Sequence, residues 1–125
     1  MTLKIESDSS NTPTIKLAGR LDSETAPGLD RTLDQVLASQ SVTRLVFDLG
    51  DLEYLSSAGI RCFIRARKSL EPRGGKVAVI NPQPAVRKVL EIVKAIPAGG
   101  LFNSVAELDE YLDAMQRQVR DQDPK

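Results

Sequence analysis

The sequence predicts an α/β fold in which about four helices pack on a mixed sheet of about four or five strands. Apolar and polar side chains alternate at residues 2–6 and 13–18, as they do in strands with one buried face. Residues 43–49 have a nearly continuous apolar centre, which is typical of a strand covered on both faces. Apolar residues with a helical period separate and follow these strands. This order favours parallel pairing within the sheet.

The beginning of the chain predicts a hairpin followed by a helix. The alternating segments at 2–6 and 13–18 are joined by a Ser-Ser-Asn turn at 9–11. A helix is then expected from Ser23 or Thr25 to Ser39, because small polar residues of this kind favour a helix start. Its apolar face comprises Ala26, Leu29, Leu33, Val36 and Leu37.

The middle of the chain predicts a strand, a helix and a second strand. The strand at 43–49 is followed by a helical pattern over residues 57–70 and a glycine-containing turn at 72–75. A strand is expected at 76–80. Because a helix connects the two strands, they should pair in parallel through a right-handed crossover.

Two further helices are expected downstream. The first begins near Pro82 with Asn81 as its N-cap, and its apolar face comprises Val86, Val89, Leu90 and Val93. The last helix begins after Ser104, which forms a capping box with Glu107. Its apolar residues are Leu108, Tyr111, Leu112, Met115 and Val119.

Length and charge limit the classes of partner. A chain of 125 residues suits one domain, expected at 1–119, with a polar tail at 120–125 that should fray. Lys plus Arg equals Asp plus Glu at 17 each, so the chain lacks the positive excess that drives direct nucleic-acid binding. No apolar run is long enough for membrane insertion, and no apolar leader follows a basic stretch. A cytoplasmic location is therefore expected.

The residue types present argue against an enzyme. The chain has no histidine, which is the commonest general base and transition-metal ligand. No motif with metal-ligand or phosphate-loop spacing occurs, so no cofactor is expected. Cys62 lies between apolar neighbours in a helical pattern, which favours a small buried side chain. A hydrolase with Ser57 as its nucleophile is disfavoured because no histidine is available to activate it.

The segment from Leu52 to Arg61 is the best candidate for function. Its two serines and small residues precede the helix expected at 57–70, and Ser57 is expected to be the N-cap. Free amides at a helix start bind anions, so a phosphate on Ser57 would meet donors that are already oriented. Gly59 is expected to leave room for another molecule.

The same helix carries a basic stripe, formed by Arg61, Arg65 and Lys68 at helical spacing. Such a stripe could face an acidic partner or the phosphates of a nucleotide. A structural interpretation also remains, in which Ser57 only caps the helix, Gly59 only allows close packing, and the stripe is a solvated face.

In these segments the chain resembles a STAS domain, and specifically the bacterial anti-sigma factor antagonist (anti-anti-sigma factor) family. The resemblance extends over about residues 3–115 and depends on the order of several motifs. These motifs are residues 17–22, 45–49 and 54–60, and Asn81-Pro82 with Val86 and Leu90 downstream.

The resemblance implies a STAS fold and a partner-switching role in the regulation of transcription. In that family a serine kinase of the GHKL ATPase type, which is also the anti-sigma factor, phosphorylates the antagonist at a helix start, and a PP2C-type phosphatase reverses the reaction. Alignment on Gly59 places the phosphorylated serine at Ser57. The family's aspartate is replaced by Ser56 and its second hydroxyl residue by Ala58. Ser56 is therefore an alternative acceptor.

The surface expected to bind the partner surrounds this serine. It comprises Asp22, Tyr54, Ser56, Ser57, Gly59, Ile60 and Arg61. An alternative function is a non-phosphorylated STAS scaffold subunit of a transport or signalling complex, in which Ser57 caps the helix and contacts a protein surface.

Overall fold

The computed structural model describes residues 3–8, 10–95 and 105–122, which form one mixed sheet and four α-helices. The strands are β1 (Leu3–Ser7), β2 (Thr14–Leu21), β3 (Arg44–Leu55) and β4 (Lys76–Ile80), and they lie in this order across the sheet. β1 pairs antiparallel with β2, as the predicted hairpin requires, whereas β2–β3 and β3–β4 are parallel. The α/β fold and the strand–helix–strand crossover are confirmed.

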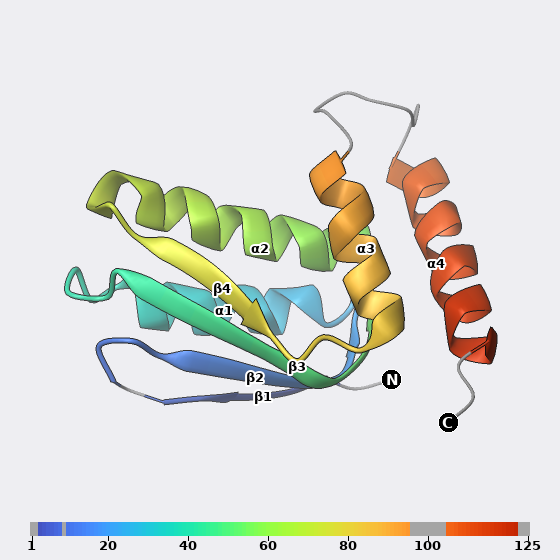
Figure 1. Cartoon of the computed structure of the whole chain (residues 1–125). Helices are drawn as coiled ribbons and strands as arrows, with labels where there is room; N and C mark the ends of the chain where they lie inside the picture. The colour runs from blue at the N-terminus through green and yellow to red at the C-terminus, as the bar shows by residue number, and fades with distance from the viewer. Residues whose placement is uncertain (1–2, 9, 96–104, 123–125) are drawn as a thin grey trace.

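The helices occupy two positions around the sheet (Figure 1). α1 (Ala26–Leu37) and α2 (Ser57–Leu70) contact each other and cover the sheet, while a short 3₁₀ helix at Glu71–Arg73 follows α2. α3 (Pro84–Ala95) and α4 (Val105–Gln122) contact each other beside the end of the sheet where β3 and β4 finish. The start of α2 lies at this same end, so β3, α2, α3 and α4 meet there.

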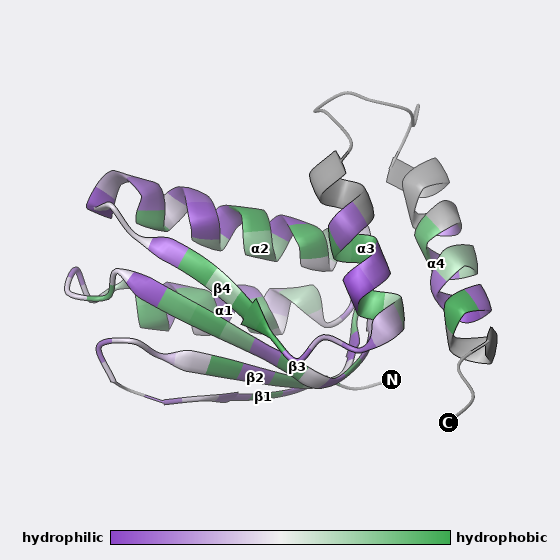
Figure 2. Ribbon diagram, in the orientation of Figure 1, coloured by the Kyte–Doolittle hydropathy of each residue, from purple (hydrophilic) through white to green (hydrophobic). Residues whose placement is uncertain are grey.

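The core lies between the sheet and helices α1 and α2. Alternate residues of β2 and β3 are buried, and the apolar faces of the helices meet them (Figure 2). The largest fully buried side chains include Ile15, Leu17, Leu45, Phe47, Leu49, Leu29, Leu33 and Leu70. Each buried leucine or phenylalanine contributes about 1.5–3 kcal/mol, so this layer is the main source of stability. None of the described helices is both long and apolar enough to cross a bilayer.

β3 is longer than its sequence pattern predicts. The strand expected to end at residue 49 continues to Leu55, through a Gly50-Asp51 pair that resembles a turn. Pairing with β2 explains the extension, because the ladder runs to Leu21 opposite Leu55. The register shifts near Gly19, whose φ of 110° suits glycine, and this irregularity allows both strands to continue.

The start of α3 was predicted wrongly. The helix begins at Pro84 rather than near Pro82, and Asn81 is not its N-cap. Asn81 instead has a left-handed φ of 59°, and its amide group lies 3.5 Å from Oδ1 of Asp48. Asparagine tolerates this backbone region better than most residues, which explains its use in the turn after β4.

α4 extends beyond the predicted domain boundary. α4 runs to Gln122, so residue 119, expected as the last residue of the domain, lies within the helix. The predicted capping residue Ser104 falls outside the described residues, as do the side chains of Glu107, Leu108 and Tyr111.

Arg73 fastens the end of α1 to the turn before β4. Its guanidinium donates hydrogen bonds to three backbone oxygens, those of Leu37 at 2.7 Å, Ser39 at 2.9 Å and Val42 at 3.0 Å. Arg73→Ala should therefore lower the free energy of unfolding by about 1–3 kcal/mol, measured by urea denaturation.

Arg67→Ala is the matched control for Arg73→Ala. Arg67 is exposed and forms an ion pair only with Glu71, one helical turn away, among the residues the structure describes. Its replacement should change stability by less than about 0.5 kcal/mol. Equal effects of the two substitutions would contradict the role given to Arg73.

Candidate functional site

The carboxyl ends of β2 and β3 hold the start of α2 in place. The Ser56 N–H donates to the Leu21 backbone oxygen at 2.9 Å, which continues the β2–β3 pairing by one step past the strand. Ser56 has extended backbone angles and is the N-cap, and Ser57 is the first residue of the helix. The expectation that Ser57 is the N-cap is wrong by one residue, but its position at the helix start is confirmed.

Both serines are buried at this junction. Ser56 and Ser57 are each 6% exposed. Ser56 Oγ is inaccessible and receives no hydrogen bond from the described part of the chain, and it makes no side-chain cap to the helix. A buried hydroxyl without a partner costs about 1–3 kcal/mol.

The first turn of α2 presents backbone N–H groups. The earliest intrahelical bond runs from the Ile60 N–H to the Ser56 oxygen at 3.0 Å. The amides of Ala58 and Gly59 precede this bond and therefore have no intrahelical acceptor. With the positive end of the helix dipole, they form a site suited to an anion on Ser57. No group of residues with metal-ligand chemistry occurs within 3–8, 10–95 and 105–122.

Gly59 packs against the core instead of leaving space for a partner. A methyl group added to its Cα would lie 2.6 Å from Leu21 Cγ and 2.6 Å from Leu55 Cδ1. The room expected beside Gly59 is therefore occupied by the chain's own leucines. Ile60 is also buried in the core cluster. Gly59 and Ile60 therefore hold the first turn of α2 against the core.

Asp22 and Tyr54 flank the site from the strand ends. The Asp22 carboxylate accepts hydrogen bonds from the backbone N–H groups of Glu24 at 3.0 Å and Thr25 at 3.1 Å, so it orders the turn into α1. The Arg20 guanidinium lies 3.9 Å from the centre of the Tyr54 ring, a cation–π contact. Sequence reasoning selected Asp22 and Tyr54 but missed Arg20, which is directly opposite Tyr54 in the ladder.

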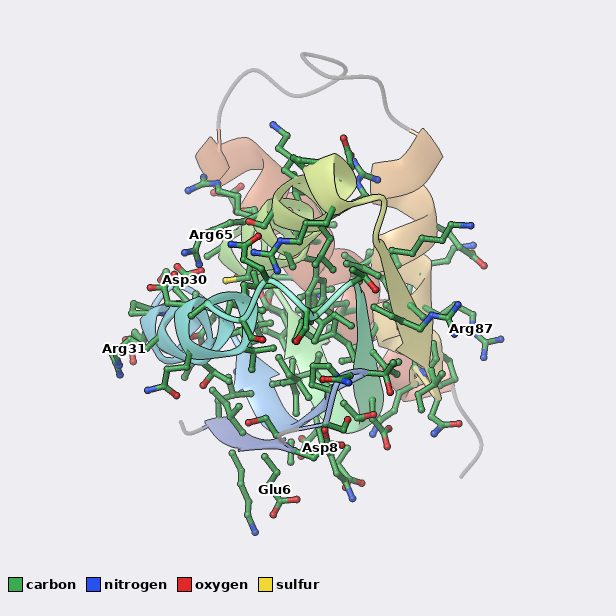
Figure 3. The ribbon with its side chains drawn as sticks, turned by 90° about the vertical axis from the view of Figure 1, so that its left-hand side faces the viewer. Glu6, Asp8, Asp30, Arg31, Arg65 and Arg87 are labelled. Atoms are coloured by element: carbon green, nitrogen blue, oxygen red, sulfur yellow. The ribbon has the colours of Figure 1, made fainter. Side chains whose placement is uncertain are left out.

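The predicted basic stripe is only partly available. Arg65 extends from α2 toward α1, where it pairs with Asp30 at 3.0 Å and also with Asp34 (Figure 3). Arg61 and Lys68 remain exposed, and neither forms an ion pair with a described residue. Among the described residues, Arg61 is therefore the unpaired cation of the stripe that is closest in sequence to the start of α2.

Cys62 is buried behind the site, as its sequence context predicted. It is 2% exposed, and its thiol lies 3.4 Å from Oδ1 of Asp30. Burial, with a smaller effect of the nearby Asp30 charge, raises the pKa of Cys62 from 9.0 to about 12.

Cys62 should consequently resist alkylation. Because the thiolate is the reactive form and the pKa is raised, the thiol stays protonated in the folded protein from neutral pH to about pH 10. Iodoacetamide at pH 8 should label the native protein at least about 100-fold more slowly than the urea-unfolded protein, measured by intact-mass spectrometry. Equal rates would contradict the burial described.

Gln83 and Gln116 are neighbours of the site that sequence reasoning missed. Their side-chain amides bind the backbone of β3 at Gly50 and Leu55 respectively. The available signal was a polar residue on the apolar face of α4, since Gln116 falls between Leu112 and Val119 at helical spacing.

Comparison with known proteins agrees with this arrangement. The sequence model of the STAS domain matches residues 5–108, which is most of the chain. The chain belongs to the STAS domain family. The STAS fold expected from the sequence motifs is therefore confirmed.

Relatives of this STAS domain are named as anti-sigma factor antagonists. The anti-sigma F factor antagonist of Paenibacillus polymyxa is 25% identical over 101 residues, which cover 81% of each chain. A solved anti-sigma factor antagonist from Mycobacterium paratuberculosis matches 95% of each chain with a TM-score of 0.64 and 24% identity. Bacillus SpoIIAA in its phosphorylated form matches 74% of this chain and 83% of its own with a TM-score of 0.58 and 22% identity, a likeness of fold.

Proposed function

We propose that this STAS domain is an anti-sigma factor antagonist that binds an anti-sigma factor with serine kinase activity and is released when Ser57 is phosphorylated. The observation that supports this most is the place of Ser57 in the fold. It is the first residue of α2, where the carboxyl ends of β2 and β3 meet free helix amides. The proposed role is that of a binding protein in the cytoplasm, where anti-sigma factors act on transcription, and it requires no catalysis.

The relatives support the proposed class of partner. The protein from Paenibacillus polymyxa bears the name of an antagonist of an anti-sigma factor. SpoIIAA, which shares the fold, has been solved in unphosphorylated and phosphorylated forms. A phosphorylation switch is therefore compatible with this architecture, and we extend it to Ser57 as a proposal.

Phosphorylation should change binding without unfolding the domain. A phosphoserine carries about −1.5 to −2 charges at neutral pH. At a helix N-terminus this charge is favoured by about 0.3–2 kcal/mol. The same charge opposes docking because an unpaired charge buried at an interface is costly.

The partner would contact exposed Arg61 and half-buried Asp22 near Ser57, with the accessible edge of Tyr54, which is 8% exposed, beside them. Arg61, Asp22 and Tyr54 surround the start of α2 and can supply charge and an aromatic surface. Gly59 and Ile60, expected earlier as contacts, would act indirectly by holding the first turn against Leu21 and Leu55.

A kinase assay tests the acceptor. The protein is incubated with a GHKL-type anti-sigma kinase and ATP, and phosphate is located by peptide mass spectrometry. Wild type and Ser56→Ala should be modified at Ser57, whereas Ser57→Ala should not be modified. A PP2C-type phosphatase should then remove the phosphate. Unchanged phosphorylation of Ser57→Ala would exclude this acceptor and favour Ser56.

A scaffold function without phosphorylation is the second candidate, and the burial of Ser57 favours it. A side chain that is 6% exposed suits a residue that only shapes the helix start. This candidate predicts that kinase and ATP leave partner binding unchanged, measured by pull-down before and after treatment. Loss of binding after treatment would exclude the scaffold.

A further inference from the structure

α4 is fastened to the end of β3 by one buried side chain. Gln116 is 2% exposed, and its Oε1 accepts a hydrogen bond from the Leu55 N–H at 2.9 Å. Its Nε2 donates to the Leu55 backbone oxygen at 2.8 Å and to the Leu112 oxygen at 3.1 Å. The amide thus binds both backbone groups of the residue that precedes Ser56.

This contact is possible because β3 extends beyond the last residue of β3 that pairs with β4. The β3–β4 pairing ends at Asp48 opposite Ile80, so the later part of β3 has no strand on that side among the described residues. Backbone groups at such an edge require other partners. Gln83 Nε2 donates to the Gly50 oxygen at 2.9 Å, and Gln116 binds Leu55. Gln116 therefore replaces a missing strand beside the functional serines.

The hydrogen bonds between Gln116 and Leu55 can break and re-form as α4 moves away from β3 and returns. Gln116 occupies an inward position next to buried Leu112 on the same face of α4, where an apolar side chain would normally lie. An apolar side chain loses its burial when a helix lifts away, whereas an amide and the Leu55 backbone can exchange their mutual hydrogen bonds for bonds to water. Gln116 thus adds, to the burial of Leu112, a contact whose hydrogen bonds water can replace.

We propose that α4 is a reversible cover over the start of α2, latched by Gln116, and that it must move before another protein can reach Ser57. α4 contacts α2 as well as α3, and it lies at the end of the molecule where α2 begins (Figure 1). Phosphoryl transfer requires the acceptor oxygen about 3 Å from the reacting phosphorus, and Ser57 is only 6% exposed in this arrangement of α4. The regulatory meaning depends on the proposed function, but the movement of α4 does not.

Two adjacent backbone amides test the movement in the unmodified protein. The Leu55 N–H is bonded to Gln116 on α4, whereas the Ser56 N–H is bonded to the Leu21 oxygen on β2. If α4 opens separately from the sheet, hydrogen exchange corrected for intrinsic rates should be at least about ten-fold faster at Leu55 than at Ser56. Equal protection of the two amides would overturn the proposal.

A cysteine probe tests what the movement exposes. In a Ser57→Cys background, the rate of labelling by a neutral maleimide is compared with and without Gln116→Met, which keeps the side-chain length but removes the amide. Labelling of residue 57 should rise about ten-fold, and Cys62 should stay protected and report that the domain is folded. Gln118→Met, an exposed position on the same helix, should have no effect.

The outcomes separate this proposal from the phosphorylation switch. Faster labelling in Gln116→Met, together with no phosphorylation of wild type by anti-sigma kinases, would support the cover and contradict the proposed function. Labelling that is unaffected by Gln116→Met would overturn the cover, even if Ser57 is phosphorylated. If Gln116→Met also exposes Cys62, the comparison of the Leu55 and Ser56 amides in the unmodified protein decides the question.

Discussion

Ser57→Asp should bind the anti-sigma partner about 30-fold to several thousand-fold more weakly than the unmodified protein. A charge left unpaired at an interface costs about 2–5 kcal/mol, and each 1.4 kcal/mol corresponds to a factor of ten in affinity. The domain itself should tolerate the carboxylate, because it would lie at the start of α2, where negative charge is favoured. Isothermal titration of the partner measures the change.

Ser41→Asp is the matched control for this charge. Ser41 is exposed in the turn before β3, at the opposite end of the sheet from the start of α2. The same added charge there should leave affinity within about two-fold, because exposed charges are screened by salt and solvent. Affinity that falls equally in both variants would show that net charge, and not its position at Ser57, governs binding.

Gly59→Ala should lower the free energy of unfolding by about 1–3 kcal/mol. Alanine normally stabilises a helix interior relative to glycine by about 1 kcal/mol. Here the new methyl group would lie within 2.6–2.8 Å of Leu21 and Leu55, which are fully buried and have little room to move. The cost of overpacking should exceed the gain in helix propensity. Urea denaturation of the purified variant measures the difference.

Gly28→Ala, at a helical glycine with room for a methyl group, should raise the free energy of unfolding. A methyl group on Gly28 in α1 would lie 3.7 Å from Arg31 and 3.8 Å from Ile5, which are ordinary contact distances. This substitution should stabilise the protein by about 0.5–1 kcal/mol. Destabilisation by Gly28→Ala would contradict the open space described beside α1, and stabilisation by Gly59→Ala would contradict the tight packing described for α2.

The sequence predicted those parts of the fold that depend on local patterns. Periodicity identified the hairpin strands, α1 and α2, and the turn at 72–75 placed β4 after them. It failed for β3 after residue 49, where Gly50-Asp51 resembles a turn and only pairing with β2 keeps the strand extended. It also misplaced the start of α3, since Asn81 favours both helix caps and left-handed turns.

The candidate site was predictable in position but not in environment. The serines and the helix pattern placed Ser57 at the start of α2, a local property. The burial of Ser57, the packing of Gly59 on Leu21 and the latch from Gln116 all depend on contacts between distant segments. Arg65 illustrates the same limit, because its partners Asp30 and Asp34 belong to another helix.

The most direct measurement follows a preformed complex of this protein and its anti-sigma partner after ATP is added. Phosphate incorporation at Ser57, partner release and far-ultraviolet circular dichroism are recorded on one sample. The partner should leave at the rate at which Ser57 is modified, while the dichroism of the STAS domain stays constant. A complex that persists after complete modification, or a domain that unfolds as phosphate enters, would contradict the switch at α2.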